Sequence, residues 1–304
     1  MKSLSIIFKG LIMGISDLVP GISGGTIAFI LGIYEEFIFS LSKLSISSIK
    51  KLKNEGFFVF WNQINGSFLL KLFSGILIGL SLFTYLIDWL INNYKIPLWA
   101  FFLGVLISSV FIILKKIKRK KPFHLLLFII GVLISFSISQ ITPSAQSGSI
   151  NAPYLFFSSF IAISAMMLPG ISGAYILILF GTYSEVISVF KGLLSILVLQ
   201  AYPDLNIILY KSFVIFSGII SGILIFSKFI KWLLLKYYDN TLVILIGLIL
   251  GGLSKIWPWQ ENGEIVWPYD FSGENYLIIS IILFIVGITL ILGIDICNKT
   301  KSNA

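Results

Sequence analysis

The chain has 304 residues, of which 57% are hydrophobic and only 12% are charged, and its mean hydropathy is +1.00. A soluble domain carries about 25% charged residues, so this composition excludes a soluble enzyme and a disordered chain. One Cys and one His exclude a disulfide framework and a Cys/His metal site, and no cofactor is indicated. The net charge of +9 is typical of the cytoplasmic loops of a membrane protein, which favours membrane lipids and no nucleic acid as partners. We expect an all-α polytopic membrane protein with a single integral membrane domain over residues 1–304.

The first feature along the chain is a pair of apolar runs, at 4–19 and 26–41, that are too short to cross a bilayer. Each has about 15 residues, whereas about 20 helical residues are needed to cross roughly 30 Å of hydrocarbon. The runs are separated by Pro-Gly-Ile-Ser-Gly-Gly at 20–25, and Pro and Gly interrupt a helix. Such a break is tolerated in a membrane where protein or water satisfies the free backbone groups. We therefore expect a re-entrant hairpin of two half-helices over residues 4–41.

The same arrangement occurs again in the second half of the chain. A second hairpin is expected over residues 154–189, where runs at 154–168 and 174–189 flank Pro-Gly-Ile-Ser-Gly-Ala at 169–174. Six other apolar runs have the length of full crossings, namely 67–91, 97–114, 122–141, 212–234, 241–256 and 276–297. The sequence therefore predicts two hairpins and six transmembrane helices.

Basic residues predict the orientation of these elements, because loops rich in Lys and Arg remain on the cytoplasmic side. Such residues cluster at 43–53, 115–121, 228–236 and 299–301. The polar loop 142–151 and the Trp-rich loop 257–271 lie between these clusters along the chain. If each hairpin leaves the membrane on the side from which it entered, all basic clusters are cytoplasmic and the two other loops are external. The N- and C-termini are then both cytoplasmic.

The two halves of the chain match each other beyond the hexapeptide, which indicates a duplication. Residues 20–24, Gly32, Tyr34 and Glu36 recur at an offset of 149 as residues 169–173, Gly181, Tyr183 and Glu185. At an offset of 143, Ser74, Gly75, Gly79, Trp89, Tyr94 and Gly104 correspond to Ser217, Gly218, Gly222, Trp232, Tyr237 and Gly247. We expect repeat 1 to cover about 1–141 and repeat 2 about 153–297.

The second repeat is expected to be inverted in the membrane. Each repeat contains one hairpin and three crossings, and an odd number of crossings turns the second copy upside down. The equivalent of the basic loop 115–121 is the aromatic and acidic segment that begins at 257, which agrees with opposite sides of the bilayer. Inverted repeats with broken helices are typical of secondary transporters, which hold their substrate near the midplane at the repeat interface. The hairpin tips, 20–26 and 169–174, are expected to converge at that point.

The tips carry the residue types of an anion site. A Pro-Gly-x-Ser-Gly turn that begins a helix offers free N–H groups and a positive dipole end, and nearby hydroxyls add donors. The alternative is that the glycines only allow close packing, which leaves the matched Ser23 and Ser172 unexplained. The residues expected to bind a phosphate are Gly21, Ser23, Gly24, Gly25, Thr26, Gly170, Ser172 and Gly173.

Three carboxylates are candidates for proton coupling, because a carboxylate inside a membrane is costly and often lies on a proton or substrate path. Glu36 and Glu185 correspond to each other in the two repeats, and their places near hairpin ends agree equally well with solvation at the interface. Asp17 precedes the first tip, where it either caps the tip or takes up a proton.

Two segments of this chain resemble the paired signatures of a bacterial membrane family long catalogued as domain of unknown function 368. They are DLVPGISGGT at 17–26 with GIY at 32–34, and MLPGISG at 167–173 with GTY at 181–183. That family includes undecaprenyl-phosphate (polyprenyl-phosphate) translocases of the PopT type. The resemblance implies a non-enzymatic flippase of undecaprenyl phosphate in the bacterial cytoplasmic membrane, which recycles the carrier lipid of cell-envelope synthesis. Copy two has Ala174 and Tyr175 in place of Gly25 and Thr26, so the second tip lacks the mate of Thr26.

Two other functions remain open from the residues alone. A transporter of another small or lipid-linked anion would need a cation near the midplane if its substrate were soluble, and no basic residue lies near either tip in the sequence. An integral-membrane lipid-phosphate enzyme would need a nucleophile, a base and basic phosphate ligands. The single His, His124, follows the basic loop and lies far from both tips in the predicted topology, which disfavours that enzyme.

Overall fold

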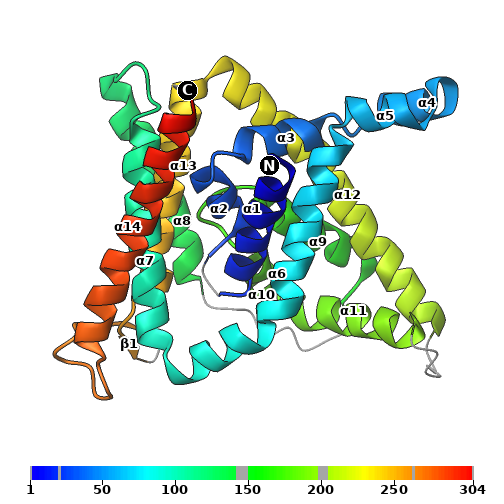
Figure 1. Cartoon of the computed structure of the whole chain (residues 1–304). Coiled ribbons are helices and arrows are strands. Elements are labelled where there is room, and N and C mark those ends of the chain that lie inside the picture. The colour runs from blue at the N-terminus through cyan, green and yellow to red at the C-terminus, as the bar shows by residue number, and fades with distance from the viewer. Residues whose placement is uncertain (1, 20–21, 142–149, 198–204, 262–263, 303–304) are drawn as a thin grey trace.

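A computed structural model describes residues 2–19, 22–141, 150–197, 205–261 and 264–302. Helices make up most of these residues, with a single two-stranded antiparallel hairpin among them. Six of the described helices are long and apolar enough to cross a membrane, which confirms a multi-pass membrane protein. Figure 1 shows these long helices running between two ends of the molecule, with the short helices α1 and α2 between them.

The six long helices agree with the predicted crossings, with one exception at the start of α12. They are α6 (Gly66–Asn93), α7 (Lys95–Leu114), α8 (Pro122–Gln140), α12 (Leu205–Lys236), α13 (Tyr238–Gly252) with its 3-10 extension η1 (Leu253–Ile256), and α14 (Leu277–Ser302). Helix α12 begins before the expected start at 212 because Lys211 is accommodated within it. The Lys211 ammonium lies 2.5 Å from the Glu185 carboxylate, so its charge is paired.

The first hairpin contains three helices, α1 (Lys2–Asp17), α2 (Gly24–Ile30) and α3 (Tyr34–Ser42). Helix α2 begins at Ser23, whose side-chain oxygen accepts the N–H of Gly25. It ends at Gly32, whose φ of +70° favours glycine, and the N–H of Ile33 returns to the carbonyl of Ala28 at 3.0 Å. The chain then bends by 120° into α3.

The second hairpin repeats this design with α9 (Ala152–Met166), α10 (Gly173–Leu179) and α11 (Tyr183–Leu197). Ser172 caps α10, Gly181 ends it at a φ of +65°, and the bend into α11 is 117°. The expected continuous return arms, 26–41 and 174–189, are therefore wrong: each contains a seven-residue helix followed by a bend. The physical reason is the matched pair Gly32 and Gly181, which terminate the helices through left-handed backbone conformations.

The long helices pack in pairs through close backbone contacts at glycine. Gly75 on α6 lies against the Ile7 carbonyl of α1, and Gly218 on α12 lies against the Phe156 carbonyl of α9. Helix α7 packs against α14, and α8 packs against α13. The third long helix of each half is thus paired with the second long helix of the other half. Small residues permit such approaches between membrane helices.

The two ends of the molecule carry different elements (Figure 1). Helices α3, α4 (Ile46–Glu55) and α5 (Phe57–Gln63) lie at one end, called here the α3 end. Helix α11 and the strands β1 (Gln260–Glu261) and β2 (Glu264–Ile265) lie at the opposite end, the α11 end. The two hairpins therefore enter from opposite ends. The sequence did not anticipate α4 and α5, because their short pattern lies within a segment expected to be a basic loop.

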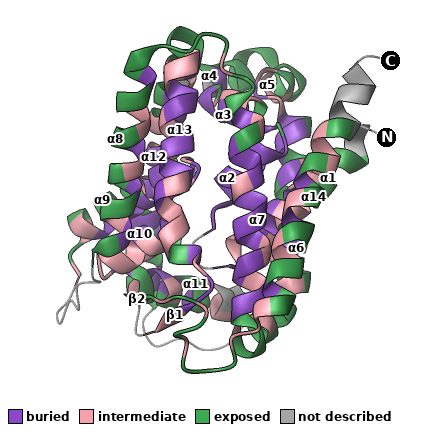
Figure 2. Ribbon diagram, turned by 90° about the vertical axis from the view of Figure 1, so that its left-hand side faces the viewer, coloured by how far each residue is buried: buried purple, intermediate pink, exposed green. Residues whose placement is uncertain are grey.

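Burial distinguishes inner from outer helices. In the most apolar stretch of each helix, 78% of the residues are buried in α7 and 56% in α13. The corresponding share is 22% in α6 and α8 and 17% in α14. Figure 2 shows this difference as buried residues on α2, α7 and α13 and exposed residues on the outer helices. Exposed apolar side chains on the outer helices are expected in a protein surrounded by lipid. Residues 22–26 of the first hairpin tip are also all buried.

Candidate functional site

The two hairpin tips contact each other directly, as the sequence predicted. The N–H of Gly170 in the second tip donates to Oγ1 of Thr26 in the first at 2.9 Å. The Ser23 hydroxyl donates to the Met166 carbonyl at the end of α9, with Oγ 3.3 Å from the oxygen. Ser23 and Thr26 are 2% and 1% exposed, so these contacts are shielded from solvent. The described residues of the first tip are all buried, whereas Gly170 and Ser172 of the second tip are half-buried.

Backbone donors at the tips are mostly engaged within the protein. The Gly24 N–H donates to Oδ1 of Asp17 at 2.6 Å, and the Gly25 N–H donates to Oγ of Ser23 at 3.2 Å. Asp17 therefore caps the first tip, which is one of the two roles considered for it. The expectation of free N–H groups is wrong at Gly24, Gly25 and Gly170, because neighbouring side chains accept these protons. Gly21 lies outside the described residues.

The glycines of the tips are also needed for close packing. A Cβ atom on Gly24 would lie 2.6 Å from Oδ2 of Asp17, and one on Gly173 would lie 2.7 Å from the Ala162 carbonyl oxygen. Gly170 has a φ of +87°, and a Cβ there would collide with the Leu248 carbonyl. Tight packing thus accounts for these three positions independently of any ligand.

A largely apolar cavity of about 520 Å³ lies beside the tips and is called here the apolar cavity. Its polar lining consists of Asp17, Ser23, Ser159 and Ser172, with Tyr183 at α11. Its apolar walls come from five helices and include Ile76, Leu80, Ile163, Leu177, Ile187, Phe190 and Ile215. Both matched serines therefore reach one cavity whose walls suit a hydrocarbon chain.

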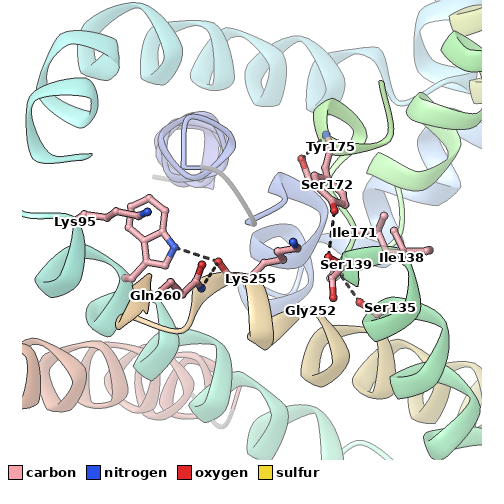
Figure 3. A pocket seen from close by; sticks show the side chains of 12 residues that line it. Lys95, Ser135, Ile138, Ser139, Ile171, Ser172, Tyr175, Gly252, Lys255 and Gln260 are labelled. Atoms are coloured by element: carbon pink, nitrogen blue, oxygen red, sulfur yellow. Dashed lines mark hydrogen bonds between the residues drawn. The ribbon is translucent and has the colours of Figure 1, made fainter. Parts of the chain in front are cut away.

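A second cavity, of about 250 Å³, adjoins the second tip and is called here the polar cavity (Figure 3). It is lined by Gly170, Ile171 and Ser172 of the tip and by hydroxyl, amide and ammonium groups of other elements. These groups belong to Ser135, Ser139, Tyr175, Gln260, Lys95 and Lys255. Ser172 lines both cavities and therefore lies between them.

The two lysines of the polar cavity correct the expectation that no basic residue lies near a tip. The Lys255 ammonium lies 5.3 Å from the centre of the Tyr175 ring, and the Lys95 ammonium lies 5.5 Å from that of Trp99. Packing of α13 against the second tip brings Lys255 close, since a Cβ on Gly252 would lie 2.7 Å from the Gly170 carbonyl oxygen. The residue matches between the two halves gave no signal for Lys255, because the residue that corresponds to it at an offset of 143 is Ile112.

The three candidate carboxylates occupy different places, and only Asp17 lines the apolar cavity. Glu36 is exposed at the α3 end and accepts a hydrogen bond from the Asn65 amide at 3.0 Å. Glu185 is paired with Lys211 on α12, with its side chain 25% exposed. The single His124 bonds through Nε2 to Oδ1 of Asn240 at 3.0 Å, near the basic loop and away from both cavities.

Comparison with known proteins supplies an independent finding. Residues 13–275 match the VCA0040-like family, described as undecaprenyl phosphate translocase-like. A polyprenyl-phosphate transporter of Vibrio cholerae is 40% identical over 276 residues, which cover 90% of this chain and 83% of that protein. A polyprenyl-phosphate transporter of Staphylococcus aureus is 33% identical over 295 residues, which cover 93% of this chain and 94% of that protein. No solved structure matches the chain.

Proposed function

The chain belongs to the VCA0040-like, undecaprenyl phosphate translocase-like family, and we propose that it translocates polyprenyl phosphate across the bacterial cytoplasmic membrane. The observation that carries this proposal is the apolar cavity, to which both hairpin tips contribute a serine. A polyprenyl phosphate combines a long apolar chain with one anionic head, so its site must join polar groups to apolar walls. The substrate would be C55 undecaprenyl phosphate returning to the cytoplasmic leaflet, where it again carries cell-envelope precursors.

The proposed architecture is an inverted repeat within one membrane domain, with repeat 1 at about 1–141 and repeat 2 at about 153–297. It is supported by the hairpins that enter from opposite ends and by the equivalent pairs α1 with α6 and α9 with α12. The reciprocal pairs, α7 with α14 and α8 with α13, also fit a two-fold relation. Such a relation would place equivalent tips at the repeat interface, where alternating access to the two leaflets is possible.

The proposed orientation puts the α3 end, with both termini, in the cytoplasm. Basic groups at that end support it, because the loop 115–121 and the last turns of α12 both lie there. The Lys116 ammonium lies 5.9 Å from the ring centre of Phe29, and Lys231 lies 5.8 Å from that of Phe39. The α11 end is then external, with the aromatic and acidic segment after Trp257.

The lipid phosphate would pass the tips, and the residues proposed to line its path are those of the two signatures: Gly21, Ser23, Gly24, Gly25, Thr26, Gly170, Ser172 and Gly173. Moving one negative charge inward against a negative-inside potential costs about 2.3 kcal/mol per 100 mV. Uptake of a proton by the protein would offset that cost. Among the three candidates, Asp17, Glu36 and Glu185, the proposal favours Asp17 because it alone lines the apolar cavity.

Translocation without chemical conversion is proposed because the relatives are named transporters. The position of His124 away from both cavities also gives no support to a His-based phosphatase. A second candidate is a transporter of soluble phosphate, and the observation in its favour is the pair Lys95 and Lys255 at the polar cavity.

The test is transport by purified protein in proteoliposomes that contain labelled undecaprenyl phosphate in one leaflet, with and without a proton gradient. We expect protein-dependent movement of the label to the opposite leaflet, with no release of inorganic phosphate. Uptake of labelled inorganic phosphate, measured in the same vesicles, should stay at the level of protein-free vesicles. Absence of lipid movement with active phosphate uptake would replace the proposal with the second candidate.

A further inference from the structure

Lys95 and Lys255 are cations without an acidic partner in the part of the chain that the structure describes. The ion pair found there joins Lys211 to Glu185 and involves neither of them. Glu261, which follows Gln260 of the polar cavity in the chain, accepts the N–H of Ser272 through Oε1 at 2.6 Å. Figure 3 shows Lys255 between Lys95 on one side and Ser172 and Tyr175 on the other. Two unpaired cations at one cavity create a positive potential that attracts an anion.

Hydrogen bonding leaves one hydroxyl in the polar cavity free to donate. Ser135 donates to the Gly170 carbonyl at 3.4 Å and Ser139 to the Phe136 carbonyl at 2.7 Å. The Tyr175 hydroxyl donates to the carbonyls of residues 139 and 141, at 3.2 and 3.1 Å. Ser172 accepts the N–H of Tyr175 at 3.4 Å, and none of the described residues accepts its proton. Its hydroxyl can therefore donate to a ligand.

The position of Ser172 indicates that the ligand has both a polar and an apolar part. This residue lines both the polar cavity and the apolar cavity, and the next two residues, Gly173 and Ala174, line only the apolar one. An anionic head beside Lys255 would therefore have its attached chain directed past Ser172 toward Leu177 and Ile187. A soluble anion would use the polar cavity and leave the apolar walls without a partner.

We propose that Lys255 and Ser172 bind the phosphate head of a prenyl phosphate in the polar cavity, while the apolar cavity holds the first isoprene units of its chain. This inference rests on the proposed function and adds the ligands of the head and the place of the tail. Lys255 provides the charge, and Ser172 provides a hydrogen bond at the junction. Lys95, beside Trp99 at the far side of the cavity, adds to the attraction from a greater distance. Gln260 of β1, at the α11 end, lines the polar cavity, so this site would receive lipid from the external leaflet in the proposed orientation.

The test measures binding of farnesyl phosphate, farnesol and inorganic phosphate to purified full-length protein by calorimetry. Lys255→Gln removes the charge, and Ser172→Ala removes the hydrogen-bond donor. Each variant should weaken the binding of farnesyl phosphate about 10- to 100-fold, as expected for loss of a bond to a charged group. Lys255→Arg should restore binding to within a few-fold. Lys191→Gln, a matched loss of an exposed lysine on α11 outside both cavities, should change the affinity less than twofold.

Binding of farnesol, and a variant whose apolar cavity is filled, test the head site and the tail site separately. Lys255→Gln should leave farnesol binding unchanged, whereas Ile187→Trp should weaken farnesol and farnesyl phosphate together without changing inorganic phosphate. An unchanged affinity of Lys255→Gln for farnesyl phosphate would overturn the assignment of the head. Inorganic phosphate binding as tightly as farnesyl phosphate would overturn the assignment of the tail.

The proposed function can fail separately from this inference. Wild-type protein that moves undecaprenyl phosphate in proteoliposomes, with full activity in Lys255→Gln, retains the function and rejects the head site. Wild-type protein that binds farnesyl phosphate through Lys255 but moves no lipid retains the site and rejects translocation.

Discussion

Asp17 illustrates how one side chain can combine a structural and a functional role. Its carboxylate accepts the Gly24 N–H at 2.6 Å and also lines the apolar cavity. The first contact stabilises the start of α2, and loss of such a cap typically costs about 1 kcal/mol. The second places an ionisable group beside the proposed lipid path. The two roles can be separated by substitution, since asparagine keeps an acceptor but does not ionise.

We therefore expect Asp17→Asn to fold like the wild type and to lose the stimulation of lipid transport by an inward proton gradient. Asp17→Ala should additionally lower the melting temperature, because the Gly24 N–H loses its acceptor. Asp88→Asn, at an exposed carboxylate on α6, is the matched control and should keep the stimulation. The measurement is the rate of lipid movement in proteoliposomes with and without the gradient. Full stimulation in Asp17→Asn would show that protons couple elsewhere.

Gly170 provides a test of the left-handed backbone conformation in the second tip. A residue with a side chain at its φ of +87° costs about 1–3 kcal/mol, and the collision with the Leu248 carbonyl adds to that cost. Gly170→Ala should lower the melting temperature of the purified protein by several degrees. Gly293→Ala is the matched control, because a Cβ at Gly293 meets nothing within 4 Å and alanine favours a helix. Equal melting temperatures for the two variants would contradict the strained turn.

At the scale of elements, the hairpins combine a long entering helix with a seven-residue return helix. The return helices α2 and α10 are short because Gly32 and Gly181 end them, and α3 and α11 then turn by 120° and 117°. Short return helices bring the tips into contact in the interior, where Gly170 donates to Thr26. The Gly170 N–H and the Ser23 hydroxyl join the two hairpins, and the Gly24 and Gly25 N–H groups are bonded within the first hairpin. Under the proposed function, side chains of the cavity walls would therefore bind most of the phosphate.

Contact between the hairpins predicts a cross-link. In a Cys297→Ser background, the double variant Ser23→Cys and Ser172→Cys should be joined by a short bifunctional thiol reagent, because both positions line the apolar cavity. The pair Ser23→Cys with Ser45→Cys is the control and should not react, since Ser45 caps α4 at the α3 end. The measurement is a mobility shift on gels after cleavage of an engineered site between the halves. Cross-linking of the control pair alone would contradict the arrangement.

For the molecule as a whole, charge and topology set the orientation in the membrane. The basic loop 115–121 lies at the α3 end, and its residues 118 and 119 donate backbone N–H groups to the Asp239 carboxylate. Tyr269 is 85% exposed and belongs to the segment that follows β2, and this segment lies at the α11 end. A Cys at residue 118 and a Cys at residue 269 therefore report opposite sides of the bilayer.

We expect Tyr269→Cys to react with a membrane-impermeant maleimide in intact cells, and Lys118→Cys to react only after permeabilisation. Both variants should be labelled equally in detergent, which controls for thiol reactivity. The reverse pattern would invert the whole molecule in the membrane and would make the α11 end cytoplasmic.

The sequence by itself determined the membrane class, the six crossings and the two broken helices. These are local properties, because the length of an apolar run sets whether a helix can span and Pro-Gly breaks it wherever it occurs. The family signatures at 17–26 and 167–173 are local as well, and so are the residue matches between the two halves of the chain. Gly32 and Gly181 were visible as matched residues, but a glycine ends a helix only in a backbone conformation that the sequence does not specify.

Tertiary structure alone decided which polar groups of the tips are free and which cations lie near them. The Gly24 N–H is taken by Asp17 and the Gly170 N–H by Thr26, so a donor that appears free in the sequence is already paired in the fold. Lys255 and Ser172 line one cavity only because α13 packs against the second tip. Hydrogen bonds and charge contacts depend on distances of a few ångströms between segments far apart in the chain, and packing sets those distances.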